Sequence, residues 1–102
     1  MQKITIKLER NEYIAIYNAM KMIDVQPFTA SLKYKAQYEL LQKLFMRMTQ
    51  KIFTLQAKCT YSLTVAEAWA FFEKMPSVMN RIGIYEQNAV QKVINAIHQQ
   101  TA

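Results

Sequence analysis

The single cysteine and the single histidine are the two side chains best suited to nucleophilic chemistry or to binding a soft metal ion. In a nucleophilic enzyme, Cys59 would be the nucleophile and His98 its general base. However, Cys59 alternates with apolar neighbours in a way that favours a core position. His98 lies near the polar end of the last predicted helix, where a cation suits the helix dipole. We therefore interpret both residues as structural.

Other chemistry is equally poorly supplied. Structural zinc needs four Cys or His ligands and catalytic zinc needs three, whereas this chain offers one residue of each type. With one glycine, the chain also lacks the glycine-rich loop that cradles phosphate groups. The sequence therefore predicts no catalytic residue, no metal, no cofactor and no small-molecule substrate, and we do not expect an enzyme.

A loose internal repeat indicates how the chain is organised. ITIKLERNEYIAIYNAM at 4–20 aligns without gaps with CTYSLTVAEAWAFFEKM at 59–75, and five positions are identical. Both copies alternate apolar and polar residues and then change to a helical period, which is typical of a strand followed by a helix. The repeat therefore predicts two strand-then-helix units.

The remaining segments are predicted from periodicity and capping signals. Strands are expected at Lys3–Leu8 and Leu55–Leu63, where apolar and polar residues alternate. Thr64 and Glu67 form a capping box that starts a helix. Pro27 ends the first helix, because a proline disfavours helical backbone in the residue before it. Helices are predicted at 13–23, 31–53, 65–75 and 85–99, with a loop at 77–83.

These elements predict one domain, 1–102, of the α+β class and mainly helical. Two strand–helix–helix halves would share a two-stranded antiparallel ribbon packed on about four helices, because a lone ribbon is unstable. An all-α bundle is the alternative, since Leu55 and Cys59 also continue the apolar spacing of the long helix. The predicted core residues are Ile6, Leu8, Ile16, Tyr17, Leu41, Phe45, Trp69, Phe72, Val93 and Ile97.

Net charge, apolar runs and cysteine content limit the classes of partner and the compartment that we expect. The chain carries a formal charge of +6, most of it in the first half, which attracts polyanions but is also explained by solvated lysines. The apolar runs are too short to span a bilayer, so no membrane partner is expected. A single cysteine suits a reducing compartment, and we expect a cytoplasmic protein.

The long amphipathic helix at 31–53 is the first candidate binding element. Its apolar residues follow a four-three spacing that is typical of a coiled-coil seam. The same stripe would also form in the core of a monomer. We therefore expect a non-catalytic interaction module that binds a protein partner or a second copy of itself through Tyr34, Tyr38, Leu41, Phe45, Met48 and Ile52.

The predicted ribbon is the second candidate binding element. A strand followed by two helices, twice, is similar in outline to ribbon-helix-helix proteins, although each subunit of that family contributes one strand and this chain carries two. The resemblance implies that paired antiparallel strands enter the DNA major groove. It implies base contacts from Lys3, Thr5, Lys7, Lys58, Thr60 and Ser62. Phosphate would be held at the start of the long helix, near Ser31, Lys33 and Lys35.

Overall fold

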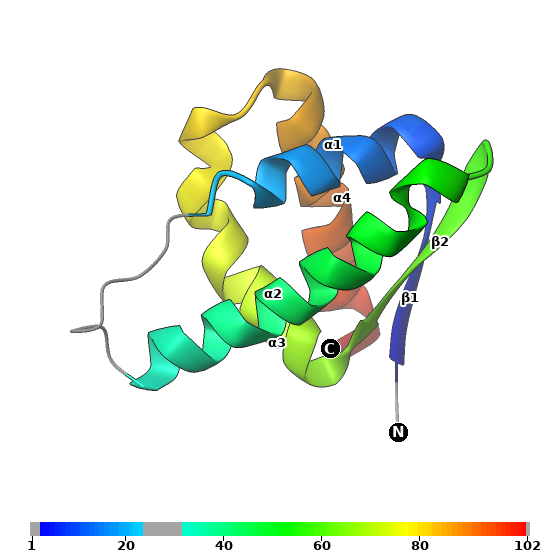
Figure 1. Cartoon of the computed structure of the whole chain (residues 1–102). Helices are drawn as coiled ribbons and strands as arrows, with labels where there is room; N and C mark the ends of the chain where they lie inside the picture. The colour runs from blue at the N-terminus through cyan, green and yellow to red at the C-terminus, as the bar shows by residue number, and fades with distance from the viewer. Residues whose placement is uncertain (1–2, 24–31, 102) are drawn as a thin grey trace.

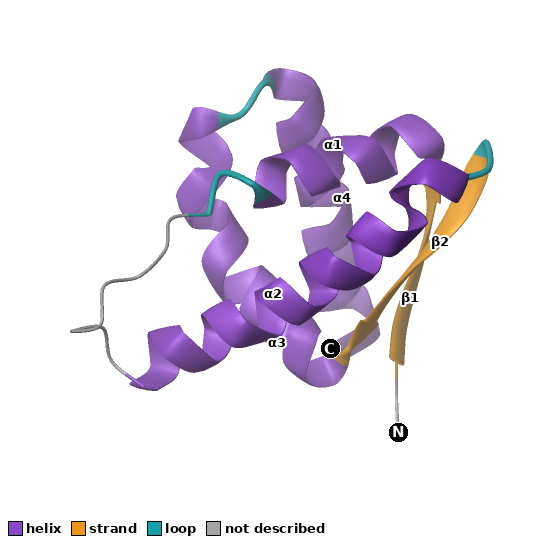
Figure 2. Ribbon diagram, in the orientation of Figure 1, coloured by secondary structure: helices purple, strands orange, loops and turns teal. Residues whose placement is uncertain are grey.

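The computed structural model describes residues 3–23 and 32–101, apart from the side chain of Tyr34. Four α-helices pack on one side of a two-stranded sheet that lies at the edge of the molecule (Figures 1 and 2). This confirms the predicted α+β, mainly helical class, and the all-α alternative is wrong. In chain order the elements are β1 (Lys3–Glu9), α1 (Arg10–Met20), α2 (Leu32–Lys51), η1 (Ile52–Thr54), β2 (Lys58–Thr64), α3 (Val65–Lys74), η2 (Met75–Arg81) and α4 (Ile84–Thr101).

The ribbon is antiparallel and its register follows from the alternating sequence. Lys3 lies opposite Thr64, and Glu9 opposite Lys58. Along β1 every second residue is buried and those between are exposed, as the hydrophobic pattern predicts. The central pair is Ile6 and Tyr61, whose inward side chains join the core. The Tyr61 hydroxyl lies 3.4 Å from the sulfur of Met48, which links the ribbon to α2.

The two halves repeat in structure as they do in sequence. β1 and β2 occupy equivalent positions of the repeat and lead directly into α1 and α3. In α1 the Glu9 amide donates to the Glu12 side chain, at 2.9 Å. In α3 the Thr64 amide donates to Glu67, also at 2.9 Å, and Thr64 accepts from the Glu67 amide. Each strand therefore ends in a capping box that sets the start of its helix.

The helices of the two halves pack reciprocally. The main helix contacts are α1 against α4 and α2 against α3, so the first helix of each half packs on the second helix of the other. Two ion pairs follow the same exchange: Glu12 on α1 with Lys92 on α4, and Glu67 on α3 with Arg47 on α2. Together with the central pair of the ribbon, this arrangement gives the chain an approximate two-fold axis.

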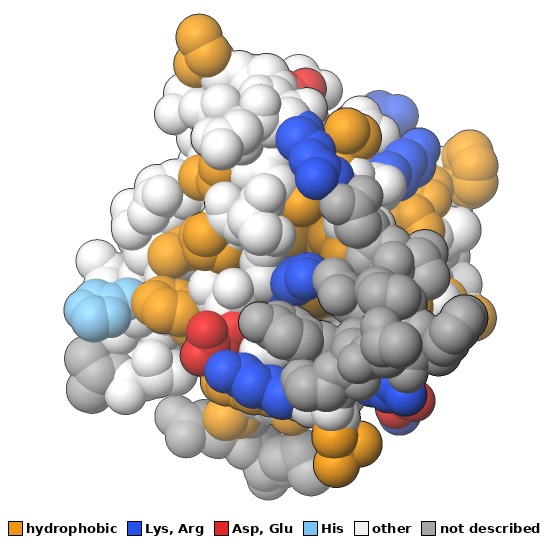
Figure 3. Space-filling model, turned by 90° about the vertical axis from the view of Figure 1, so that its left-hand side faces the viewer, with side chains coloured by type: hydrophobic (Ala, Val, Ile, Leu, Met, Phe, Trp, Pro, Cys, Tyr) orange, Lys and Arg blue, Asp and Glu red, His pale blue; other side chains and the backbone are white. Residues whose placement is uncertain are grey.

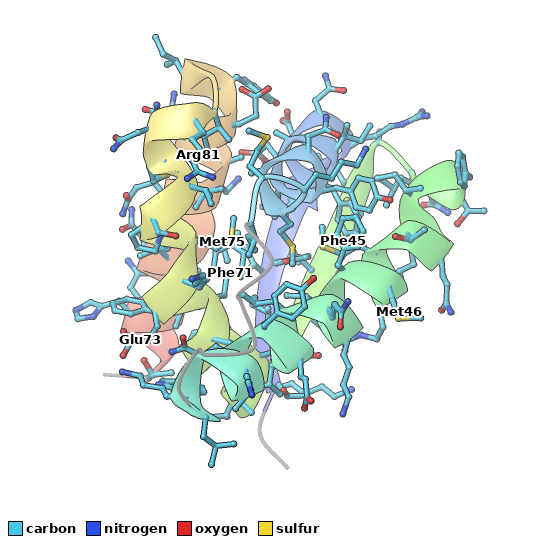
Figure 4. The ribbon with its side chains drawn as sticks, turned by 60° about the vertical axis from the view of Figure 1, so that its left-hand side comes forward. Phe45, Met46, Phe71, Glu73, Met75 and Arg81 are labelled. Carbon is cyan, nitrogen blue, oxygen red and sulfur yellow. The ribbon has the colours of Figure 1, made fainter. Side chains whose placement is uncertain are left out.

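The buried face of α3 differs from the predicted one. Trp69 and Phe72 were expected in the core, but their exposed fractions are 40% and 42%. Phe71 is fully buried instead, as is Met75, and both point toward the interior between the helices (Figure 4). Glu67 is also buried on this helix and accepts a hydrogen bond from Arg47, which agrees with the observed rotation of α3. The other predicted core residues are buried or partly buried.

Element ends differ in smaller ways. The long helix was predicted at 31–53, whereas the described α-helix ends at Lys51 and continues as a 3-10 turn. Ser31 and the predicted stop at Pro27 lie outside the described residues. The predicted loop at 77–83 is mostly the 3-10 helix η2, since proline is tolerated in a first helical turn. The last helix extends to Thr101, two residues beyond the predicted end.

Candidate nucleic-acid interface

The outward face of the ribbon carries all six residues predicted to contact a nucleic acid. The antiparallel register places Thr5 opposite Ser62 and Lys7 opposite Thr60, and the residues between them point into the core. Ser62 is half-buried and the other five are exposed. The structure therefore brings these side chains together on one surface, in two parallel rows. We call this surface the ribbon face: Lys3, Thr5, Lys7, Glu9, Lys58, Thr60, Ser62 and Thr64.

The approximate two-fold axis passes through the ribbon face between Ile6 and Tyr61. It relates Lys3 to Lys58 and Thr5 to Thr60, so each end of the face has a lysine and a threonine two positions further along the strand. The three lysines outnumber the single acid, Glu9. Ammonium groups donate hydrogen bonds and hydroxyls both donate and accept, so the face offers the donors and acceptors that reading base edges requires.

The free edge of β1 is covered by a side chain from α4. The Gln100 amide donates to the Thr5 carbonyl at 3.0 Å and accepts from the Thr5 amide at 3.3 Å. A side-chain amide thus takes the place of a neighbouring strand, which protects the edge from pairing with another chain. The outward direction of the Thr5 backbone groups also agrees with the bond from the Arg10 amide to the Ala57 carbonyl, just beyond the pair of Glu9 and Lys58.

The free edge of β2 is covered by the ion pair of Arg47 and Glu67. Arg47 makes two hydrogen bonds to the Glu67 carboxylate, one of them 2.7 Å long, and a third of 3.3 Å to the Ser62 carbonyl. Burial alone would raise the pKa of Glu67, but the bonds from Arg47 and Thr64 outweigh it and lower that pKa. The bond to Glu67 raises the pKa of Arg47, so this pair stays charged at neutral pH.

A helix lies next to each of the two edges of the ribbon: α2 beside β2 and α4 beside β1. Between α2 and β2 lies a groove of about 380 Å³, whose lining includes the cations Lys3, Arg47 and Lys51 and the hydroxyls of Thr60 and Ser62. Beside β1, the surface of α4 has a shallow, open hollow of about 440 Å³ lined by Ile6, Lys92 and amide side chains of α4. The basic residues beside the ribbon face are therefore mainly on the β2 side, since Lys92 on the β1 side is paired with Glu12.

The start of α2 does not belong to this surface. Figure 1 shows α2 beginning at the side of the molecule away from the ribbon and ending beside it. Lys33 and Lys35 are exposed in the first turn of α2, so they do not share a surface with the ribbon face. The side away from the ribbon carries hydrophobic and basic side chains interspersed with one another (Figure 3).

The predicted interaction face of α2 lies largely against the rest of the domain. Leu41 and Met48 have exposed fractions of 2% and 1%, and the Phe45 ring stacks on Tyr17 with centroids 4.6 Å apart. Tyr38 and Ile52 are half-buried. The wide apolar arc of this helix is explained because α2 contacts both α1 and α3. The accessible part borders a groove of about 350 Å³ between α1 and α2, lined by Met20, Ile23, Tyr38, Leu41 and Phe45, among others.

Cys59 has the surroundings of an unreactive thiol. It is half-buried on β2, and its Sγ lies 3.5 Å from the Leu8 carbonyl oxygen. Burial raises the pKa of the Cys59 thiol, which favours the protonated, non-nucleophilic form. His98 is exposed in the last turn of α4. Within residues 3–23 and 32–101, no three His, Cys, Asp or Glu side chains are grouped so that they could hold a metal ion.

Three residues of this region were missed by sequence reasoning. Arg47 and Gln100 cover the two edges of the ribbon, and Lys51 lines the groove beside β2. Lys51 lies one helical turn beyond Arg47, a spacing that could have indicated a basic edge on the long helix. Gln100 has no local signal, because it acts on a strand at the opposite end of the sequence.

No family model, no curated protein and no solved structure matches this chain. In the described part of the chain, no helix combines the length and the apolar character needed to cross a membrane.

Proposed function

We propose that this protein is a non-catalytic, cytoplasmic DNA-binding protein that places its ribbon face in the major groove of a duplex. The observation that carries the proposal is the paired arrangement of Lys3 and Thr5 with Lys58 and Thr60 about the two-fold axis. A major groove admits a two-stranded ribbon, and duplex DNA has local two-fold axes that a symmetric reader can match. The resemblance to ribbon-helix-helix proteins implies a ribbon with one strand from each of two strand–helix–helix units. Here both units belong to a single chain.

Charge supports the same proposal. Lys3, Lys7 and Lys58 lie on the ribbon face, and Lys51 lies in the adjoining groove. Neutralising phosphates with such cations releases condensed counterions, so binding should weaken steeply as the salt concentration rises. Arg47 is already paired with Glu67, and we assign it to holding the ribbon edge instead of to phosphate.

A fluorescent duplex of random sequence tests the proposal at low salt. Lys3→Glu, Lys7→Glu and Lys58→Glu should each weaken binding. The fall of log K with log salt should also become less steep, by about 0.9 for each cation–phosphate contact that is lost. Lys33→Glu makes the same charge change in the first turn of α2, away from the ribbon, and is the matched control. An absence of binding at low salt, or equal weakening by the control, would refute the proposal.

A second candidate is a protein-binding site at the groove between α1 and α2. Its support is the accessible part of the predicted interaction face, Tyr38, Phe45 and Ile23, which lines an apolar groove. Under this proposal the groove binds a protein partner or a second copy of the chain. A rise in molar mass with concentration in light scattering, abolished by Tyr38→Asp, would support self-association. A constant monomer mass would exclude it.

A further inference from the structure

We propose that the DNA site consists of two half-sites in inverted orientation that are similar but not identical. This inference rests on the proposed function and concerns which sequence the ribbon face reads. It follows from comparing the two ends of that face, which the two-fold axis makes equivalent in backbone but which differ in side chains.

The outer and inner pairs of the face can be compared directly. At one end the outer pair is Lys3 with Thr64 and the inner pair is Thr5 with Ser62. At the other end the outer pair is Lys58 with Glu9 and the inner pair is Thr60 with Lys7. The lysine of each outer pair and the threonine of each inner pair are therefore shared. These shared contacts predict an inverted repeat in the target.

The symmetry is broken next to the axis. Lys7 corresponds to Ser62, so one inner pair combines a hydroxyl with an ammonium group and the other combines two hydroxyls. A lysine donates to guanine O6 and N7, whereas a serine is shorter and can both donate and accept. Glu9 and Thr64 also differ, but both occupy N-cap positions, where they start α1 and α3. Lys7 and Ser62 are thus the main discriminating residues.

A homodimer that reads DNA with two identical strands offers the same side chains to both half-sites, whereas a single chain can offer different side chains to each. The half-site under Lys7 should contain a guanine next to the centre, and the half-site under Ser62 should differ at that position. The chain should then bind in one orientation, with β1 and β2 distinguished by the DNA.

Selection from a pool of random duplexes tests this inference. The wild-type chain should enrich an imperfect inverted repeat that differs at one position near its centre. Ser62→Lys makes both inner pairs threonine–lysine and should enrich a perfect repeat with guanine in both halves. Lys7→Ser makes both pairs hydroxyl and should enrich a different perfect repeat. Each variant should bind its own repeat roughly tenfold more tightly than the wild-type site.

The outcomes separate the inference from the proposed function. No retention of any duplex at low salt refutes DNA binding itself. Enriched sites without an inverted repeat, or a perfect repeat for the wild-type chain, refute the inference while DNA binding stands. An unchanged site for both variants also refutes it. Lys33→Ser is the control that should leave the selected site unchanged. Circular dichroism verifies that each variant is folded. If only one of Ser62→Lys and Lys7→Ser folds, the site selected by that variant is enough to test the inference.

Discussion

Replacing Phe71 by alanine should destabilise the fold far more than the same replacement at Phe72. The two residues are adjacent on α3, and the substitutions remove the same atoms from the same helix. Phe71 is fully buried, with its ring 6.5 Å from that of Tyr61, whereas 42% of Phe72 is exposed. The comparison therefore isolates burial from helix propensity and from residue type.

The expected magnitudes follow from that difference. Emptying a closed site in the core costs the transfer free energy of the ring and an additional cavity term, about 3–5 kcal/mol for a phenylalanine. Phe72 leaves no closed cavity, and a little over half of a burial worth about 1.5–3 kcal/mol is lost, which gives about 1–2 kcal/mol. With a urea slope of about 2 kcal/mol/M, the midpoint should fall by about 2 M for Phe71→Ala and by less than about 1 M for Phe72→Ala.

Urea unfolding monitored by circular dichroism measures both shifts. A Phe71→Ala variant that is unfolded without urea also fits the expectation, provided that Phe72→Ala is folded. Equal midpoints, or a larger loss for Phe72→Ala, would mean that α3 is rotated so that Trp69 and Phe72 face the core. The inward position of Glu67 would then be wrong as well.

Three further outcomes are expected. Because the pKa of Glu67 is lowered in the folded chain, its contribution to stability is present at neutral pH and is lost as the pH falls below about 4.3. Glu67→Gln should therefore cost about 2 kcal/mol at pH 7 and less at pH 3, while the exposed Glu73→Gln changes little; equal costs at both pH values contradict the assignment. Gln100→Ala should speed hydrogen exchange of the Thr5 amide and cost about 1 kcal/mol, and an unchanged rate would show that the edge is not covered; Gln99→Ala is the control. Cys59 should react with a thiol reagent at pH 8 more slowly in the folded chain than in urea, since burial raises the pKa of its thiol; equal rates would exclude a protected thiol.

The two strands and the start of α3 were predictable because their signals are local, although β2 begins at Lys58 instead of Leu55 and α1 at Arg10 instead of residue 13. Alternation in Lys3–Leu8 and the capping box of Thr64 and Glu67 depend on neighbouring residues, and both predictions are confirmed. The gathering of the six nucleic-acid candidates on one face also follows from alternation, once the two strands pair in register. Whether that face binds DNA stays a prediction.

The rotation of α3 could not be read from spacing alone. Val65, Trp69 and Phe72 recur at helical spacing and have large side chains, so they compete with Ala68, Phe71 and Met75 for the inward face. The observed rotation places Glu67 where it pairs with Arg47 on another helix, a contact that the local sequence does not reveal. The reciprocal packing of α1 on α4 and α2 on α3 is likewise a long-range result of the antiparallel ribbon.

The reciprocal helix contacts have a consequence for how the chain acquires its fold. A fragment ending after η1 would contain β1, α1 and α2 but would lack β2, α3 and α4, against which those three elements pack. Neither this fragment nor the one that holds the rest of the chain should have a stable structure by itself. A mixture of the two fragments should reassemble by complementation. Joining the units in one polypeptide makes each the template for the other at high effective concentration, so the intact chain should gain and lose its structure in one cooperative step.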